Sequence, residues 1–385
     1  MDIRPCIKYV GVNDHEIDLF EGQYIVPNGM AYNSYVIIDQ KIAVMDTVDA
    51  CFIDRWLDNI ESVLDGRTPD YLVVQHMEPD HSSGIQAFAD RYPEAQIVSN
   101  AKAFPMMQAF FGEDYASRRI LAADGVTLSL GERTLAFVTA PMVHWPEVIL
   151  TYIPEEKLLF SADAFGKFGA LDVEEEWDCE ARRYYIGIVG KYGAQVQAVL
   201  KKAAGLDIEC ICPLHGPVLT GDGITNALTK YQIWSTYAVE DKGVTIAYAS
   251  IYGHTAAAAI ELANTLEEAG VTVEMFDLAR DDMAEAVECA FRYDRLVLAA
   301  STYNNDVFPF MRTFIDHLTA RNFQSRTVAF IENGSWAPAA QKVMRGMLEN
   351  SKNLTYVNNN VTIKSALNDD SSAALAALAQ ELMAQ

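Results

Sequence analysis

The sequence predicts an α/β protein of two domains. A mixed domain with considerable antiparallel content (residues 1–242) precedes a doubly wound domain with a parallel sheet (residues 243–385). Three observations predict this division. The chain has 385 residues, while a single domain usually has about 150. Short strand patterns with turn signals dominate the first part. After residue 242, strand and helix patterns alternate regularly, which is typical of a parallel sheet.

The second domain is expected to contain five strand–helix units. Its first helix pattern has Gly270 as a natural stop. We expect strands over residues 244–250, 271–276, 296–300, 327–331 and 354–357, and helices over 256–269, 282–292, 310–320, 338–349 and 372–384.

In the first domain, the closely spaced apolar runs 36–39 and 42–45 predict a hairpin. Cys210 and Cys212 are two residues apart, so on a strand they face the same side, where we expect them to act as small apolar core residues. Helices are expected over residues 52–64, 86–91 and 104–110, and further strands over 71–75, 97–99, 126–128, 135–139, 148–153 and 158–161.

Composition excludes several classes of protein. Half of the residues are hydrophobic and a fifth are charged, which excludes wholesale disorder. The net charge of −24 disfavours nucleic acid and anionic membrane surfaces as partners. The first residues carry charge with no apolar segment behind them, so no signal peptide is expected. The six scattered cysteines form no C-x-x-C pair, which favours reduced thiols and a cytoplasmic location.

The most specific motif is His76-Met77-Glu78-Pro79-Asp80-His81, which directly follows an apolar strand. It contains four side chains of metal-ligand type within six residues. An extended start would place His76, Glu78 and Asp80 on one side, with His81 opening the next element, since Pro79 cannot lie inside a helix. A single His-x-Glu is more often surface chemistry, but four ligand types after a buried strand favour a metal site.

Three later residues stand in similar positions. His144, Asp163 and His215 each follow an apolar strand and lie among glycine, proline or aromatic residues. Two other histidines are not candidate ligands: His15 is expected at a surface turn and His317 in a helix. Ligand softness alone permits zinc, manganese or iron at such a site.

This pattern resembles the metallo-β-lactamase superfamily, with a His-x-[His/Glu]-x-Asp-His loop followed by a His, an Asp and a final His. Most hydrolytic members have His where this chain has Glu78. Together with His-Trp-Pro at 144–146 and Ser-Ala-Asp-Ala-Phe at 161–165, Glu78 resembles the flavodiiron proteins. That resemblance implies a metallo-β-lactamase-like αββα domain joined to a flavodoxin-like domain.

The resemblance also implies a ligand set for two irons, and these residues are then the catalytic ones. His76, Glu78 and His144 hold one iron; Asp80, His81 and His215 hold the other; Asp163 bridges both together with a hydroxide or oxo group. Charge favours iron as well, because three carboxylates stabilise a metal that changes valence, whereas zinc has no redox role.

The loop Ser250-Ile251-Tyr252-Gly253-His254-Thr255 lies between a predicted strand and helix. Hydroxyls and backbone N–H groups at a helix N-terminus form a phosphate cradle. The loop lacks the glycine patterns of triphosphatases and dinucleotide sites, and it resembles the Ser/Thr-x-Tyr-Gly-x-Thr loop of flavodoxins.

Two further loops follow neighbouring strands, and ligands of such sheets bind at the carboxyl ends of strands. The resemblance implies FMN edged by these loops, with Trp336 or Tyr303 covering the ring; core packing is the alternative for Trp336. The loop residues are Ser301, Thr302, Tyr303, Asn304 and Asn305, and Asn333, Gly334, Ser335 and Trp336.

The implied function is reduction of dioxygen to water, of nitric oxide to nitrous oxide, or both. With no fused C-x-x-C module expected, electrons would come from rubredoxin or a reduced deazaflavin. The implied assembly is a head-to-tail homodimer, or a pair of them, in which FMN of one chain faces the irons of the other. Two alternatives stay open: a dizinc hydrolase with an accessory flavodoxin-like docking domain, and an electron carrier with a vestigial metal domain.

Overall fold

The computed structural model describes residues 2–384, and the chain divides after Gln232 into two compact units. The expected boundary lay at residue 242. The segment 233–242 belongs with the second unit because its backbone forms hydrogen bonds with residues of that unit. The guanidinium of Arg326 donates to the carbonyls of Tyr237 and Ala238, and Glu240 N donates to Arg292 O. No helix among residues 2–384 combines the length and apolar character needed to cross a bilayer.

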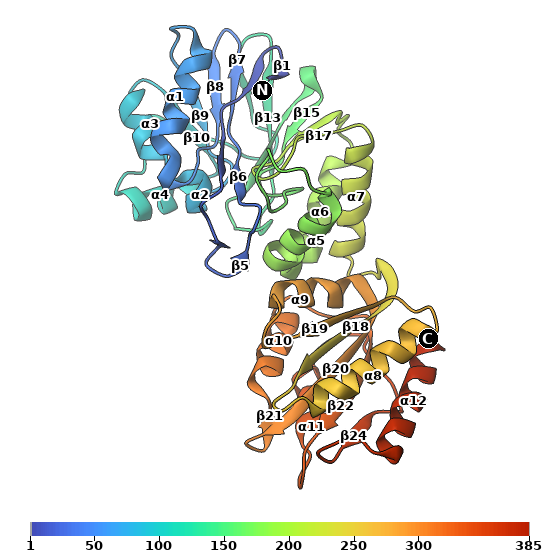
Figure 1. Ribbon diagram of the computed structural model, residues 1–385. Helices are drawn as coiled ribbons and strands as arrows, with labels where there is room; N and C mark the ends of the chain where they lie inside the picture. Colours follow the sequence, from blue (N-terminus) through green and yellow to red (C-terminus); the bar gives the residue numbers. More distant parts are fainter. Residues whose placement is uncertain (1, 385) are drawn as a thin grey trace. The chain divides into compact units, whose positions relative to one another are not determined.

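The first unit is a sandwich of two sheets with helices on both outer faces, as the αββα expectation requires (Figure 1). One sheet has the order β1-β2-β7-β8-β9-β10-β11, and the other has the order β12 to β17 in sequence. The first sheet comprises β1 (Asp2–Arg4), β2 (Ile7–Tyr9), β7 (Tyr35–Ile38), β8 (Ile42–Met45), β9 (Tyr71–Val73), β10 (Gln96–Ser99) and β11 (Arg119–Leu121).

The second sheet comprises β12 (Thr127–Ser129), β13 (Thr134–Thr139), β14 (Ile149–Ile153), β15 (Leu158–Phe160), β16 (Cys210–Cys212) and β17 (Leu219–Thr220). Alternate residues of both sheets point inward and form one core. Cys210 and Cys212 lie in this core, so their expected role as apolar core residues is confirmed. The predicted hairpin is β7–β8, an antiparallel pair.

Helices cover the outer faces of this sandwich. In α1 the buried residues Trp56, Ile60 and Leu64 recur every four positions and form one apolar stripe. Helices α1, α3 and α4 flank the first sheet and α6 and α7 flank the second (Figure 1). Their bounds, with the short α2, are α1 (Ile53–Leu64), α2 (Pro79–Ser82), α3 (Ile85–Arg91), α4 (Ala103–Phe111), α5 (Trp177–Tyr184), α6 (Gly193–Ala203) and α7 (Asp222–Ser235).

Several elements of this unit were not predicted. They include α5, α6 and α7, a π-helix over Tyr185–Val189, and two small antiparallel sheets of two strands each. One pairs β3 (Val12–Asp14) with β6 (Met30–Tyr32), and the other pairs β4 (Leu19–Phe20) with β5 (Tyr24–Ile25). Strands of two or three residues are too short to show an alternating pattern.

The second unit is a parallel sheet of order β19-β18-β20-β22-β23, with β24 also paired to β22. Its strands are β18 (Asp241–Ala249), β19 (Val273–Asp277), β20 (Tyr293–Tyr303), β21 (Asp306–Val307), β22 (Thr327–Asn333), β23 (Thr355–Tyr356) and β24 (Val361–Ile363). The expected doubly wound sheet is confirmed. The first strand, β18, lies between β19 and β20, and all neighbouring strands of this sheet pair in parallel except β20 and β21, which form a short antiparallel hairpin.

The helices of this unit follow the strands as expected. Helices α8 and α12 bury leucine and alanine side chains against Ile246, Val297 and Ile331 of the sheet. Their bounds are α8 (His254–Glu268), α9 (Met283–Arg292), α10 (Pro309–Ala320), α11 (Ala340–Met347) and α12 (Asp369–Met383). Strand β24 was missed, because Asn358, Asn359 and Asn360 separate it from the short β23 that was predicted as the whole fifth strand.

Candidate functional site

The ligand-type residues of the first unit converge from segments that follow four strands. His76 and Glu78 follow β9, and Asp80 and His81 lie in α2. His144, Asp163 and His215 follow β13, β15 and β16 respectively. Strand ends meet at one edge of the sandwich, so residues more than a hundred positions apart come within contact distance.

One local expectation was wrong. The segment 76–81 does not run extended past Pro79, because α2 begins at that proline. Proline is favoured at the first helical position, where its missing N–H costs no hydrogen bond. The helix turns Asp80 away from His76 and Glu78, and it places Asp80 beside His81 instead.

The seven side chains form two groups. In the first, Glu78 Oε2 lies 3.2 Å from His76 Nε2 and 3.0 Å from His144 Nε2. In the second, Asp80 Oδ2 lies 3.2 Å from His81 Nε2 and 3.3 Å from His215 Nε2. The two imidazole nitrogens of the second group lie 2.9 Å apart.

Asp163 is a member of the first group, and its second oxygen faces the second group. Its Oδ2 lies 3.1 Å from His76 Nε2 and 3.2 Å from His144 Nε2. Its Oδ1 lies 3.4 Å from His81 Nε2 and 3.7 Å from His215 Nε2. The carboxylate is fully buried, yet neither of its oxygens accepts a hydrogen bond. Such buried acceptors need a cation or a donor as partner.

The donor set fits a pair of metal ions. Nitrogen and oxygen atoms about 3 Å apart are spaced like ligands of a first-row ion, whose bonds measure roughly 2.0–2.2 Å. Burial lowers the pKa of His144, but the carboxylates of Asp163 and Glu78 outweigh burial and raise that pKa to about 9. Burial raises the pKa of Asp163, and the surrounding imidazoles nevertheless hold it well below its ordinary value. The site therefore favours positive charge, which a metal ion provides.

Two polar contacts outside the ligand groups fix the imidazole orientations. Glu147 Oε1 accepts from His76 Nδ1 at 2.8 Å and from Met77 N at 2.9 Å. The carbonyl of Ala31 lies 2.8 Å from His215 Nδ1. Both contacts direct Nε2 toward the carboxylates. Glu147 was not predicted as a site residue; its only signal in the sequence is that it is a charged residue three positions after His144.

Left-handed backbone conformations flank two of these side chains. Met142 has φ 64°, Ala162 has φ 50° and Phe165 has φ 68°. Non-glycine residues adopt such angles at a cost, and they concentrate at functional sites. Elsewhere, His15 is exposed beside Asp172 and His317 lies in α10, as expected.

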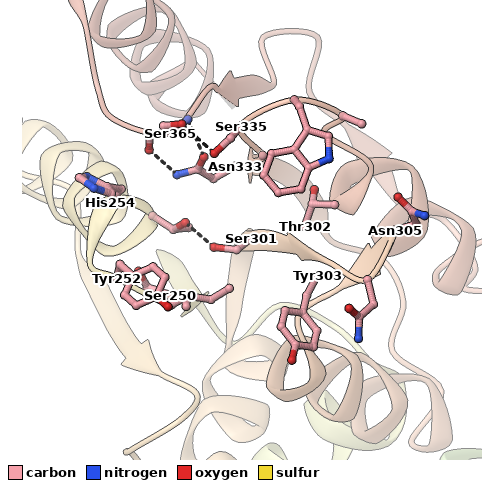
Figure 2. Close-up of a pocket in the computed structure, with 16 residues that line it drawn as sticks. Ser250, Tyr252, His254, Ser301, Thr302, Tyr303, Asn305, Asn333, Ser335 and Ser365 are labelled. Carbon is pink, nitrogen blue, oxygen red and sulfur yellow. Dashed lines mark hydrogen bonds between the residues drawn. The ribbon is translucent and has the colours of Figure 1, made fainter.

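The predicted flavin loops line one pocket of ≈ 600 Å³ in the second unit. Figure 2 shows Ser250, Tyr252 and His254 on one side, with Ser301, Thr302, Tyr303 and Asn305 facing them. Of the fifteen residues expected there, Gly253 alone does not line the pocket; the other fourteen are Ser250, Ile251, Tyr252, His254, Thr255, Ser301, Thr302, Tyr303, Asn304, Asn305, Asn333, Gly334, Ser335 and Trp336.

Gly253 has a structural position instead. It adopts φ 91° directly before α8 and donates from its N–H to Ser250 Oγ at 3.1 Å. Glycine adopts this conformation without steric cost. Thr255, 1% exposed, places its hydroxyl 2.9 Å from Ser301 Oγ. The N-terminus of a 15-residue helix thus opens into the pocket with hydroxyls beside it.

The sequence missed Ala337 and Ser365, which also line this pocket. Ser365 follows β24, donates to Ser335 Oγ at 2.7 Å and accepts at its carbonyl from Asn333 Nδ2 at 2.8 Å (Figure 2). Ser365 was missed because the strand that it follows, β24, was not predicted. Core packing, the alternative for Trp336, is wrong, because this side chain is 91% exposed. Tyr252 at 89% is nearly as exposed, while Tyr303 is half-buried.

Both units match known families of sequence. Residues 30–216 match the ODP family beta lactamase, and residues 246–351 match flavodoxin. A nitric oxide reductase of Moorella thermoacetica is 30% identical over 360 residues, covering 91% of this chain and 90% of the relative. An anaerobic nitric oxide reductase flavorubredoxin of Aliivibrio salmonicida is 28% identical over 87% of this chain and 69% of its own length.

Solved structures give the same similarity over nearly the full length. Rubredoxin oxygen:oxidoreductase from Desulfovibrio gigas has a TM-score of 0.92 at 26% identity, covering 99% of this chain and 97% of that one. The flavodiiron protein from Giardia intestinalis has a TM-score of 0.91 at 25% identity, covering 99% and 96%.

Proposed function

This chain belongs to the flavodiiron protein family, and we propose on that premise that it reduces dioxygen to water, nitric oxide to nitrous oxide, or both. Electrons pass from an external donor through FMN to a diiron site. One observation carries the proposal: the two oxygens of Asp163 face two separate groups of ligand atoms. A carboxylate shared in this way suits a pair of ions that act together.

His76, Glu78 and His144 would hold one iron, Asp80, His81 and His215 the other, and Asp163 would bridge them. When bound, the irons supply a valence change to a diatomic substrate and FMN supplies two electrons. Glu78, Asp80 and Asp163 contribute three negative charges against which cations are stabilised. Glu147 and the Ala31 carbonyl hold the imidazoles of His76 and His215 with Nε2 toward the ions.

FMN would lie in the pocket of the second unit. The backbone N–H groups at the start of α8 and the hydroxyls of Ser250 and Thr255 suit its phosphate. The loops that follow β20 and β22 offer amide and backbone groups to the ring. The exposed Trp336 and the half-buried Tyr303 are both able to cover a ring face.

The hydrolase alternative is not favoured. The similar proteins reported above carry the names nitric oxide reductase and oxygen:oxidoreductase. Glu78 stands where most hydrolytic members have histidine. A vestigial metal domain is also disfavoured, because all seven ligand-type side chains converge.

Rubredoxin or a reduced deazaflavin is the proposed electron donor, and a head-to-tail homodimer or a pair of such dimers is the proposed assembly. A cytoplasmic location, with neither nucleic acid nor membrane as partner, is expected from the sequence.

The proposed function is tested on purified protein by iron and flavin analysis followed by turnover with a chemical reductant. About two irons and one FMN per chain are expected, with measurable consumption of both gases in separate anaerobic and aerobic assays. Zinc without flavin, or no consumption of either gas by fully loaded protein, would contradict the proposal.

Thr255→Val is expected to weaken FMN binding without changing iron content. The substitution keeps the shape of the side chain and removes one hydroxyl from the phosphate cradle, where a hydrogen bond to a charged group contributes about 1.5–3 kcal/mol, or roughly 10–100-fold in Kd. Flavin titration of the apoprotein measures the change. Thr265→Val, on the exposed face of the same helix, is the matched control; equal affinities in both variants would refute the cradle.

Mixing two inactive variants tests the dimer. One variant lacks FMN through changes at Ser250 and Thr255, and the other lacks iron through changes at His76 and Asp163. If FMN serves the irons of a neighbouring chain, exchange between dimers pairs an intact flavin site with an intact iron site. Activity is then expected to reappear on mixing. If electrons pass within one chain, activity stays absent, although mass measurement shows mixed dimers.

A further inference from the structure

A second cavity, of ≈ 310 Å³, lies in the first unit between the outer face of the second sheet and helices α6 and α7. We propose that it binds the uncharged diatomic gas and delivers it toward Asp163 and His144. This inference rests on the proposed function, which identifies dioxygen or nitric oxide as the substrate.

The lining of this cavity follows from strand alternation. Ile149, Leu158 and Cys210 point into the sandwich core, so their neighbours Leu150, Leu159 and Ile211 point outward and form the cavity floor. Helices α6 and α7 supply the walls with Val196, Val199, Leu200, Ala203, Ile224 and Leu228. Among residues 2–384, no charged side chain lines the cavity.

One end of the cavity is formed by the loops that carry the ligand-type residues. Val143, which precedes His144, lines it, and so do Ala164 and Phe165, which follow Asp163. The Phe165 ring packs on Tyr231 with centroids 4.3 Å apart, and Phe165 N donates to the Tyr231 hydroxyl. The cavity therefore reaches the residues that are next in sequence to His144 and Asp163.

The other end reaches the surface. Leu228 is 41% exposed, and Ala204 beside the end of α6 is exposed too. The cavity thus extends from solvent to the ligand-bearing loops.

The lining selects apolar occupants. A water molecule inside a protein needs two to four polar partners, and cavities lined by apolar side chains take up xenon or benzene instead. Apart from backbone, the polar lining groups are the Tyr231 hydroxyl, which already accepts a hydrogen bond, and the amide of Gln232. Dioxygen and nitric oxide are uncharged and poorly hydrated, so such a space concentrates them, whereas ions and polar metabolites are excluded.

Xenon tests occupancy in the resting holoenzyme without reference to turnover. Xenon-pressurised crystals are expected to show xenon against Leu159 and Val199. Ala203→Trp fills the cavity from the end of α6, and Leu228→Trp fills it from its mouth, where an exposed position tolerates a larger side chain. Both variants are expected to exclude xenon. Ala198→Trp, on the exposed face of α6, is the matched control and keeps it.

Steady-state kinetics tests delivery. In the two filling variants we expect kcat/KM for the gas to fall roughly tenfold, within the range by which association rates vary among variants, while kcat at saturating gas and the iron and FMN contents stay those of Ala198→Trp. Absence of xenon from the wild-type cavity would overturn the inference, as would unchanged kcat/KM in variants that exclude xenon. A failure of the proposed function itself would give a different result: wild-type protein loaded with iron and FMN would then consume neither gas, whether or not xenon binds.

Discussion

Asp163→Ala is expected to abolish gas reduction and to remove both irons while FMN stays bound. The physical reason is that Asp163 contributes one oxygen to each ligand group, at 3.1 Å from His76 Nε2 and 3.4 Å from His81 Nε2. Groups one shell further from a metal already cost about 10–100-fold in affinity when they are removed. Loss of an oxygen shared by two ions is expected to exceed that range.

Iron analysis, flavin absorbance and turnover are measured on the same preparation. The FMN pocket belongs to the other unit, so its occupancy reports that this second unit has folded. Asp172→Ala, an exposed aspartate of the same unit, is the control and should keep iron and activity. Asp163→Asn, which preserves shape and removes the charge, should lose iron as well. Full iron content in Asp163→Ala would contradict the bridging role.

The sequence predicts the positions of ligand-type residues well because each follows an apolar strand. His144, Asp163 and His215 could be identified in this way although their strands are far apart in sequence. The local pattern alone placed Asp80 on the side of Glu78, whereas the family resemblance implied its grouping with His81; the helix that begins at Pro79 sets Asp80 beside His81. A four-residue helix has no periodicity from which to predict it.

Other features depend on tertiary packing and could not be read from a local pattern. Helix α7 contains Thr225, Asn226 and Thr229, which are weak helix formers, and burial of residues such as Ile224 and Tyr231 stabilises it. Ser365 reaches the flavin pocket only because β24 pairs with β22 after an asparagine-rich interruption. The cavity beneath α6 and α7 is equally a product of packing.

Glu147 is the residue of the metal site that the sequence did not reveal, and its substitution is expected to act on one ion more than on the other. Its side chain is fully buried, and Oε1 accepts from His76 Nδ1 and from Met77 N. Burial raises the pKa of Glu147, but these two donors outweigh burial and hold it below its ordinary value. The carboxylate is therefore charged, and it fixes His76 in the tautomer that leaves Nε2 free to bind a metal.

Glu147→Gln keeps the size of the side chain and removes its charge, so His76 loses its charged acceptor while the fold is retained. We expect iron affinity of the group formed by His76, Glu78 and His144 to fall by roughly 10–100-fold, with the group of Asp80, His81 and His215 less affected, because His215 is held by the Ala31 carbonyl instead. Iron titration of the apoprotein should then show one tight and one weakened site, where the wild type has two tight ones. A general loss of packing would weaken both sites and lower the melting temperature together. Glu94→Gln, an exposed substitution of the same type, is the control. Two tight sites in Glu147→Gln would show that the bond to His76 does not position this ligand.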